Sequence, residues 1–370
     1  MELLHSLRIL CEYHRRSQLH IPALDRLLNI FTQPSRASQQ PPEQDTHTPQ
    51  QYGPEGAHAP PAKAKPAVIE ITGTSPFSGK THLLYYITAV AILPTELNGV
   101  FLNGKGGAVV VLDTDSRFDV PRLKQVMKYF IRARYLEVGA LFIDEDGLED
   151  LMRHALLHVH IYRPQSPASL VATLEAIPSY LLYSAKEHFS SGRALEAVLL
   201  DSVSAFIYQD RGIESTDSNP NCNPGNPFAK RYQDIVRGLR ALQQTFKCVI
   251  VATAWGLFPC HSERQIYTKK PPPPSFRPHL PAVWTSFCTL RLIVTRDAVA
   301  KFGPGMSAEE ALKDTAARQE VVDRGGFSGW VDQGWGSDEW SEETREALKR
   351  VKGGGFFWFR IVEDGVVIED

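Results

Sequence analysis

Short apolar runs separated by longer amphipathic stretches dominate the middle of the chain. Between residues 67 and 296 these runs are rich in β-branched residues and nearly continuous in apolar character. Strands buried on both faces have this composition, and their alternation with helical stretches indicates a mostly parallel sheet covered on both sides. We therefore predict an α/β core. Its expected strands are residues 68–72, 108–113, 157–162, 195–201, 248–253 and 287–295.

Two segments of different character precede this core. Residues 1–31 carry leucines at helical spacing, which predicts a small helical segment with a second short helix at 22–31. Residues 32–66 turn to Gln, Pro, Ser, Thr, His and Ala and contain hardly any large aliphatic residue. That composition cannot offset the entropy of ordering the chain, so we expect a disordered linker.

The pattern changes again after residue 296. Residues 297–354 are charged and Gly-rich, with two helix-start signals: Ser307 with Glu310 as a capping box, and Ser341 before an acidic first turn. We interpret this segment as an insertion and residues 355–370 as a closing strand of the core. Three of the six tryptophans lie in the insertion. They mark either a partner surface or local packing onto the core, and we favour packing.

Composition restricts the class of protein. Forty basic and forty-two acidic residues leave a formal charge of -2, so any contact with nucleic acid must be local. The five cysteines are scattered and form no C-x-x-C pair, which argues against a disulfide framework and a zinc site. No apolar run reaches the roughly 18 residues of a membrane span, and the first residues lack the basic flank of a secretory signal. We expect a globular protein of a reducing compartment with no membrane partner.

The junction between the first strand and the following helix nearly matches a phosphate-binding loop, G-x-x-x-x-G-K-[ST]. Gly79, Lys80 and Thr81 supply the second half, whereas the opening Gly73 stands one residue early. An apolar strand enters and an apolar helix leaves, which is the setting that places a helix N-terminus under phosphates. We predict a nucleotide site, and its expected binding residues are Gly73, Ser78, Gly79, Lys80 and Thr81. The alternative is a degenerate loop that serves only as a turn.

Carboxylates follow two of the predicted buried strands. Asp201 ends an apolar run and, paired with Thr81, is predicted to hold magnesium; the alternative is that it caps a following turn. Asp113 and Asp115 are two residues apart, so a continuing strand would send both carboxylates to one face. For Asp115, a place in the site and a role in turn formation are both open. Asp119 before Pro121 is the expected N-cap of the next helix.

The segment after the fifth expected strand interleaves basic and aromatic residues. Basic side chains follow a phosphate backbone and aromatic rings stack on bases, which is how single-stranded nucleic acid is bound. The alternative is a solvated Pro-rich loop with incidental charge, since four consecutive prolines lie in this segment. The candidate DNA contacts are Arg264, Tyr267, Lys269, Lys270 and Arg277.

Five segments together resemble the eukaryotic branch of the RecA-like recombinases, and in particular its DNA-repair paralogues. They are "GKTHLLYYI", "VVVLDTDSRFDVPRL", "HVHIYRPQSPASLVATLEAI", "VLLDSVSAFIYQDR" and "CVIVATA", and they cover most of residues 67–296 in the expected order. The resemblance implies a nuclear ATP-binding protein that uses magnesium and acts in homologous recombination. The implied partners are other recombinase paralogues, the strand-exchange recombinase, and single-stranded or branched DNA.

The resemblance also assigns roles to individual residues. Lys80 and Thr81 match the ligands of phosphate and magnesium, and Asp201 matches the second magnesium acid. Asp115 stands where active recombinases carry a water-polarising glutamate and is one methylene shorter, and Trp255 replaces a glutamine that senses the γ-phosphate. A misplaced base costs much of the rate, so we expect weak or absent ATPase activity.

Two alternatives of other classes remain at the level of sequence. The loop alone is compatible with another P-loop enzyme, such as a kinase or NTPase, but that enzyme would need an arginine-rich lid, which the sequence does not show. The chain is alternatively a nucleotide-free scaffold that holds partner proteins. Binding of nucleotide separates the scaffold from the other two classes.

Overall fold

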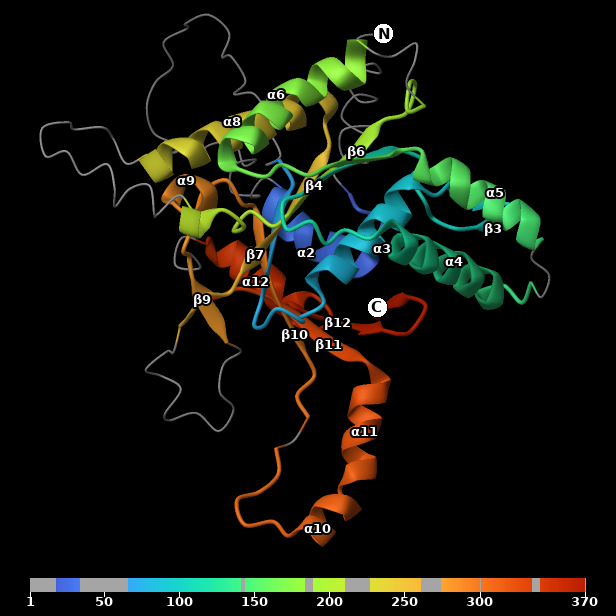
Figure 1. Ribbon diagram of the computed structural model, residues 1–370, viewed down its shortest axis with the longest axis vertical. Coiled ribbons are helices and arrows are strands. Elements are labelled where there is room, and N and C mark those ends of the chain that lie inside the picture. The colour runs from blue at the N-terminus through green and yellow to red at the C-terminus, as the bar shows by residue number, and fades with distance from the viewer. Residues whose placement is uncertain are drawn as a thin grey trace, which may run out of the picture.

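A nine-stranded mixed sheet forms the centre of the molecule (Figure 1). The computed structural model describes residues 18–33, 66–140, 144–183, 189–209, 227–260, 274–299, 301–334 and 340–369. The strands of the large sheet are β1 (Val68–Gly73), β4 (Ala108–Asp113), β5 (Val159–Tyr162), β6 (Leu195–Asp201), β7 (Val249–Trp255), β10 (Leu290–Arg296), β11 (Gly326–Val331), β12 (Phe356–Ile361) and β13 (Val366–Glu369). The predicted α/β fold is confirmed.

The strand order is β13-β12-β11-β10-β1-β7-β6-β4-β5. Neighbours from β10 through β1, β7, β6 and β4 to β5 pair in parallel, whereas β11, β12 and β13 add antiparallel pairs. The six predicted strands all occur in the parallel part, with ends shifted by a few residues. Because these strands run the same way, the loops that follow β1, β4, β6 and β7 meet at one edge of the sheet.

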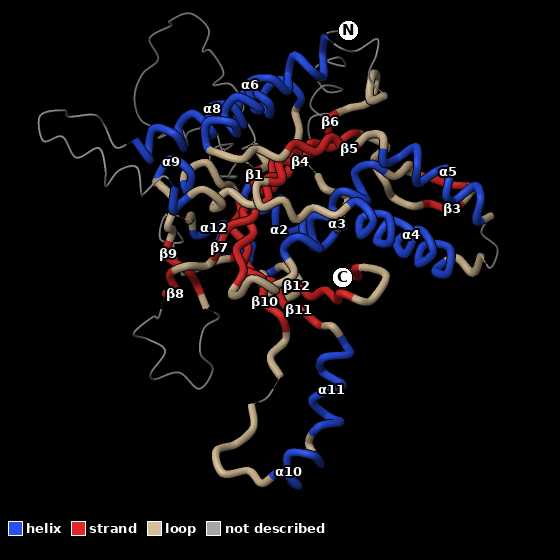
Figure 2. The backbone as a smooth tube through the Cα atoms, in the orientation of Figure 1, coloured by secondary structure: helices blue, strands red, loops and turns tan. Residues whose placement is uncertain are grey.

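Helices cover both faces of the sheet (Figure 2). Residues of α2, α3, α4, α5 and α12 share one apolar core with one side of the sheet, and residues of α6, α8 and α9 share a second core with the other side. The helices are α2 (Pro22–Thr32), α3 (Lys80–Ile92), α4 (Val120–Glu137), α5 (Glu145–Leu156), α6 (Pro167–Tyr183), α8 (Pro227–Phe246), α9 (Ala282–Thr285), α10 (Ala308–Lys313), α11 (Thr315–Arg324) and α12 (Glu342–Arg350). Strands β4, β6 and β7 are buried almost throughout, as the continuous apolar runs require.

The helix predicted at 22–31 is α2, and it belongs to the core. The buried face of α2 includes Leu24, Leu27 and Leu28, and Asp25 accepts the backbone N–H groups of Leu19 and Ile21. Residues 1–17 and most of the predicted linker lie outside the described residues. Within the described part of the chain, none of the helices combines the length and the apolar character needed to cross a bilayer.

The segment predicted as an insertion differs from the structure in its second half. Its helices α10 and α11 bury no residue and project away from the sheet (Figure 1), and Ser307 with Glu310 forms the predicted capping box. However, β11 pairs with β10 and β12 and is part of the sheet. Gly329 interrupts the apolar pattern of this strand, so β11 was not predicted. A glycine is required at this position because an added Cβ would lie 2.2 Å from the Phe357 ring. The single predicted closing strand is a hairpin of β12 and β13.

Trp330, in β11, packs onto the core as favoured. It is 4% exposed, and its ring centroid lies 6.1 Å from that of Phe356. Its indole N–H donates to the carbonyl of Pro274, next to the short hairpin of β8 (Phe258–Cys260) and β9 (Ser275–Arg277). The ring therefore joins β11 to that hairpin.

A buried ionic network connects the parallel and antiparallel parts of the sheet. Glu70 is 3% exposed and accepts hydrogen bonds from the Trp284 indole at 2.5 Å and from Arg291 Nε at 3.0 Å. The same guanidinium lies 3.8 Å from Asp332, which accepts a hydrogen bond from Ser275 in β9. Burial raises the pKa of Asp332, whereas Ser275 and Arg291 lower it. The network ties β1, β10 and the base of the β8–β9 hairpin together.

The first prediction concerns Glu70. Glu70→Ala leaves the Arg291 charge and the Trp284 N–H without their main acceptor, so we expect the free energy of unfolding to fall by about 3–5 kcal/mol. Urea denaturation measures this loss. Glu369→Ala is the matched control because it breaks an exposed pair with Arg360, and its expected loss is below about 1 kcal/mol. Equal losses for the two variants would contradict a structural role for the network.

Candidate nucleotide-binding site

The loop between β1 and α3 folds around the side chain of Lys80. β1 ends at Gly73, and α3 begins at Lys80 after Gly79, whose φ of 87° lies in the left-handed region. Lys80 Nζ lies 3.3 Å from Ser78 Oγ and 3.5 Å from the carbonyl oxygen of Ser75. The N-terminus of α3 has no side-chain cap and no acid in its first turn. Its backbone N–H groups are therefore available to donate hydrogen bonds to an anion at the loop.

Gly73 stands one residue early for the motif, at a position where a side chain has no room. A Cβ added there would lie 1.9 Å from Ser78 Oγ and 2.7 Å from Lys80 Nζ, which no real side chain tolerates. The absence of a side chain thus leaves the space into which Ser78 and Lys80 fold. The extra length of the loop is at its tip, where Phe77 is 82% exposed.

Gly79 is held from the other side by the antiparallel strands. A Cβ at this position would lie 3.0 Å from the ring of Phe359 in β12 and 3.1 Å from that of Phe327 in β11. These two rings stack with centroids 5.1 Å apart. This contact could not be predicted, because the strand that carries Phe327 lies in the segment expected to be an insertion.

Asp201 connects the loop helix to the neighbouring strands. It ends β6, is 4% exposed, and accepts a hydrogen bond from Thr81 Oγ1 at 2.9 Å. Its other carboxylate oxygen accepts a hydrogen bond from Thr253 in β7. Burial raises the pKa of Asp201, and the two threonines and Lys80 act in the opposite direction. The structure therefore brings the predicted pair of Thr81 and Asp201 together. Thr253 was not predicted, because its only signal in the sequence is a hydroxyl within a buried apolar run.

Burial also lowers the pKa of Lys80, while the nearby carboxylates of Asp201 and Asp115 raise it. Among the described residues, the ammonium group thus contacts only the Ser75 carbonyl and the Ser78 hydroxyl, and the two acids act on it from a greater distance. Such a charge is partly removed from water and has an incomplete set of anionic partners. A phosphate group would supply them.

Asp113 and Asp115 do not share a strand face as predicted, because β4 ends at Asp113. Asp113 is fully buried and accepts the backbone N–H groups of Arg117 and Phe118 and the Nε–H of Arg163. Its carboxylate is therefore fully used in holding the turn. Asp119 is the N-cap of α4, as expected.

Asp115 lies beyond the strand, close to Asp201 and Lys80. Burial, followed by the charge of Asp201, raises the pKa of Asp115, and a hydrogen bond with the Trp255 side chain lowers it. Trp255 ends β7, and its backbone N–H donates to Ser204 Oγ, which is hydrogen-bonded to His279 at 2.8 Å. The tryptophan thus contacts the acid of the site directly. The Ser204 and His279 pair was not found from sequence.

The candidate DNA contacts are only partly described. Arg277 is exposed in β9, and Arg264, Tyr267, Lys269 and Lys270 lie outside the described residues. The β8–β9 hairpin follows β7 at the same edge of the sheet as the loop of Lys80. A Cβ added at Gly256 would lie 2.4 Å from the carbonyl oxygen of Gly73, so the base of the hairpin is in contact with the start of that loop.

The strand order and the strand, loop and helix unit at β1 and α3 define a RecA-like α/β core. No protein-family model matches the chain. It is 26% identical over 263 residues to the DNA repair protein XRCC2 homolog of Arabidopsis thaliana, covering 62% of this chain and 69% of that protein. It is 24% identical over 249 residues to the DNA repair protein XRCC2 of Mus musculus, covering 65% and 77%.

A third relative is the DNA repair protein RAD51 homolog 2 of Homo sapiens, with 24% identity over 187 residues. That match covers 50% of this chain and 40% of the human protein. By its fold and by these matches, the chain is similar to RecA-like recombinase paralogues and in particular to the XRCC2 proteins. The resemblance inferred from the five sequence segments is confirmed.

The second prediction tests the space at Gly73. Gly73→Ala introduces a methyl group into the position of Ser78 Oγ, so we expect the free energy of unfolding to fall by about 1–3 kcal/mol. Gly303→Ala is the matched control, since nothing lies within 4 Å of its added Cβ, and its effect should stay within about 1 kcal/mol. Chemical denaturation measures the free energy of unfolding of both variants. A Gly73→Ala variant as stable as the control would show that the loop does not need this glycine.

Proposed function

We propose that the chain is an accessory recombinase paralogue of homologous-recombination DNA repair that binds ATP and magnesium at the loop between β1 and α3. The observation that carries the proposal is the contact of Thr81 with Asp201 beside Lys80, in a loop whose start has no room for a Cβ at Gly73. The names of the relatives support the role in DNA repair. The expected location is the nucleus, and the expected partners are other recombinase paralogues and the strand-exchange recombinase.

The residues present fit the proposed ligands. Lys80 would hold the β- and γ-phosphates together with backbone N–H groups of Ser78, Gly79 and the start of α3, and Thr81 and Asp201 would hold magnesium. Bound magnesium neutralises charge on the phosphate oxygens. In the described part of the chain no cluster of three or more His, Cys, Asp or Glu residues is arranged to hold a metal. Magnesium commonly takes one or two protein ligands and completes its shell with phosphate and water.

The surroundings of Asp115 favour nucleotide binding over hydrolysis. A general base must be ionised and placed within hydrogen-bond reach of its water. Burial and the charge of Asp201 raise the pKa of Asp115, whereas Arg117 and a hydrogen bond with the Trp255 side chain lower it, and that hydrogen bond occupies part of the capacity of the carboxylate to hold a water. We infer a slow or absent ATPase in which the nucleotide supports assembly.

Contact with single-stranded or branched DNA is proposed for the β8–β9 hairpin. Support comes from exposed Arg277 and from the basic and aromatic sequence between the two strands. The hairpin also contacts the nucleotide loop at Gly73. DNA and nucleotide would then be neighbours at one edge of the sheet.

The third prediction concerns Lys80. Lys80→Ala removes the cation that the loop encloses, so we expect affinity for a fluorescent ATP analogue to fall at least about 10-fold. The control Lys124→Ala removes an exposed lysine of α4 that is paired with Glu149 of α5, and it should leave nucleotide binding unchanged. Fluorescence anisotropy measures both. Equal binding by Lys80→Ala and the parent chain would remove the nucleotide site and favour the scaffold alternative.

The fourth prediction concerns hydrolysis. We expect steady-state turnover of ATP well below about one per second, and little further loss in Asp115→Asn. Phosphate release under saturating nucleotide and magnesium is the measurement. Turnover near that rate that disappears in Asp115→Asn would make the chain an active P-loop enzyme, contrary to the accessory role.

A further inference from the structure

Helix α8 presents a polar stripe to solvent along its whole length. Its other side packs into the core through residues that include Tyr232, Leu239 and Leu242. The exposed positions recur at alternating intervals of three and four residues, which places them on one line of a helix. The stripe consists of Lys230, Gln233, Arg237, Arg240 and Gln244, and it ends at Lys247, the residue directly after α8. At 1.5 Å per residue its length is about 25 Å.

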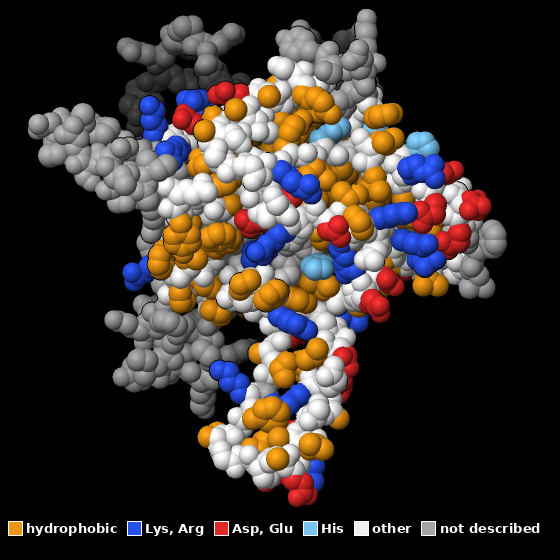
Figure 3. Space-filling model, viewed as in Figure 1, with side chains coloured by type: hydrophobic (Ala, Val, Ile, Leu, Met, Phe, Trp, Pro, Cys, Tyr) orange, Lys and Arg blue, Asp and Glu red, His pale blue; other side chains and the backbone are white. Residues whose placement is uncertain are grey.

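Most of the positive charge on this stripe is uncompensated. In the described residues no carboxylate pairs with Lys230, Arg240 or Lys247, and Asp234 pairs with Arg237 at 2.5 Å. Figure 3 shows Lys and Arg side chains at the surface over α8, at the upper left. The contrast with the opposite side of the core is clear, because Lys124 and Lys128 of α4 are paired there with glutamates of α5. Unpaired cations in a row favour a polyanion as partner.

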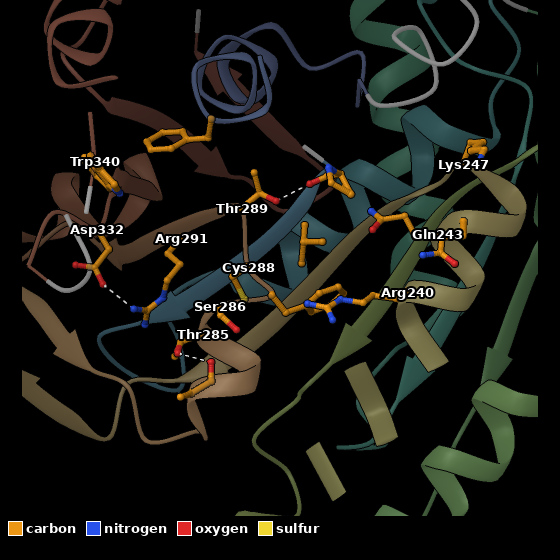
Figure 4. Close-up of a pocket in the computed structure, with 16 residues that line it drawn as sticks. Arg240, Gln243, Lys247, Thr285, Ser286, Cys288, Thr289, Arg291, Asp332 and Trp340 are labelled. Atoms are coloured by element: carbon orange, nitrogen blue, oxygen red, sulfur yellow. Dashed lines mark hydrogen bonds and ion pairs between the residues drawn. The ribbon is translucent and has the colours of Figure 1, made fainter. Parts of the chain in front are cut away.

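Two neighbouring hollows lie beside the stripe. Their volumes are about 770 and 370 Å³, and Arg240 and Gln244 line both. Thr285, Ser286 and Thr289 line the larger hollow, but each hydroxyl already donates to a backbone carbonyl, and Figure 4 shows Arg240 reaching from α8 toward the segment that carries them. Arginine, lysine and glutamine are among the side chains that contact phosphate and sugar in protein–DNA complexes, so the donors available here are those of Arg240, Gln244 and Lys247.

Contacts with the core hold the larger hollow in shape. The Arg240 guanidinium lies 5.4 Å from the Phe287 ring centroid, a cation–π contact that fixes its direction. Arg291, also in the larger hollow, is neutralised by Glu70 and Asp332 and so adds no free charge. The charge available to a ligand therefore comes from α8.

We propose that the α8 stripe is a contact surface for the phosphate backbone of nucleic acid. The larger hollow lies at the starts of β1 and β10, where Pro66 and Thr289 line it, and thus at the sheet edge opposite to Lys80. A protein partner would require an apolar or aromatic centre, and the stripe itself has none; Phe31, Phe287 and Trp340 line the larger hollow beside it. For the same reason bases do not stack on it, so single strands and duplexes both bind, without sequence preference. The proposal does not depend on nucleotide binding.

The experiment removes the three unpaired cations. The variant Lys230→Gln, Arg240→Gln, Lys247→Asn uses asparagine at the last position because Lys247 has a φ of 58°, which asparagine tolerates. Affinity of the 370-residue chain for a fluorescent single strand and for the matching duplex is measured against salt concentration. Each lost phosphate contact lowers the slope of log affinity against log salt by about 0.9 for duplex and 0.7 for single strands, so we expect a decrease of about two to three.

The controls separate this surface from others. Lys124→Gln with Lys128→Gln removes cations that are already paired and should leave the slope unchanged, and Arg240→Lys should retain the contact at that position. Arg277→Gln tests the β8–β9 hairpin by itself. An unchanged slope in a triple variant with the melting curve of the parent overturns the proposal. So does an equal decrease in the α4 control, or competition by polyglutamate as effective as that by DNA, which would indicate an acidic protein partner.

Discussion

The buried carboxylate of Asp201 is the point on which the geometry of the site depends. A charge removed from water is tolerated only where hydrogen bonds replace its hydration, and here the hydroxyls of Thr81 and Thr253 do so. The backbone carbonyl of Asp201 is also used, because it accepts the N–H groups of Thr114 and Asp115. One residue therefore fixes the start of α3, the end of β7 and the turn after β4 relative to one another. Any ligand held by Thr81 and Asp201 would meet Asp115 in a position that the same residue determines.

The antiparallel strands are part of the site, although they carry none of its polar groups. The rings of Phe327 and Phe359 lie against Gly79, and Arg122 at the start of α4 donates to the carbonyls of Val362 and Glu363 in the β12–β13 turn. The loop is thus bounded by the parallel core on one side and by this hairpin on the other. A change of loop shape would have to displace packed aromatic rings, and such interiors resist small displacements.

Some elements of the fold and of the site can be predicted from the sequence, and others cannot. The parallel strands are predictable because burial on both faces demands continuous apolar runs, and the pair of Thr81 and Asp201 follows from where two such strands end. By contrast, β11 contains Gly326 and Gly329, whose small size is required by close neighbours and removes the apolar signal. Asp115 was misplaced for a related reason: periodicity holds only while a strand continues, and no local signal shows that β4 ends at Asp113. Contacts between distant segments, such as Ser204 with His279, have no counterpart in local sequence.

The loop of Lys80 and the α8 stripe differ in how many of their polar groups already have partners within the protein. At the carboxyl edge, Lys80 bonds to Ser75 and Ser78 of the loop, and Thr81 bonds to Asp201, so a ligand there must replace existing contacts, and its affinity depends on the difference. Along the α8 stripe, Lys230, Arg240 and Lys247 have no carboxylate partner among the described residues, so an anion gains chiefly from the release of counterions. The first kind of site is selective in shape, and the second responds to charge density and salt. Because α8 runs antiparallel to the strands it covers, its stripe leads from the edge that carries the nucleotide loop to the opposite edge. A protein with both surfaces could hold a nucleic acid along its flank whether or not the nucleotide loop is occupied.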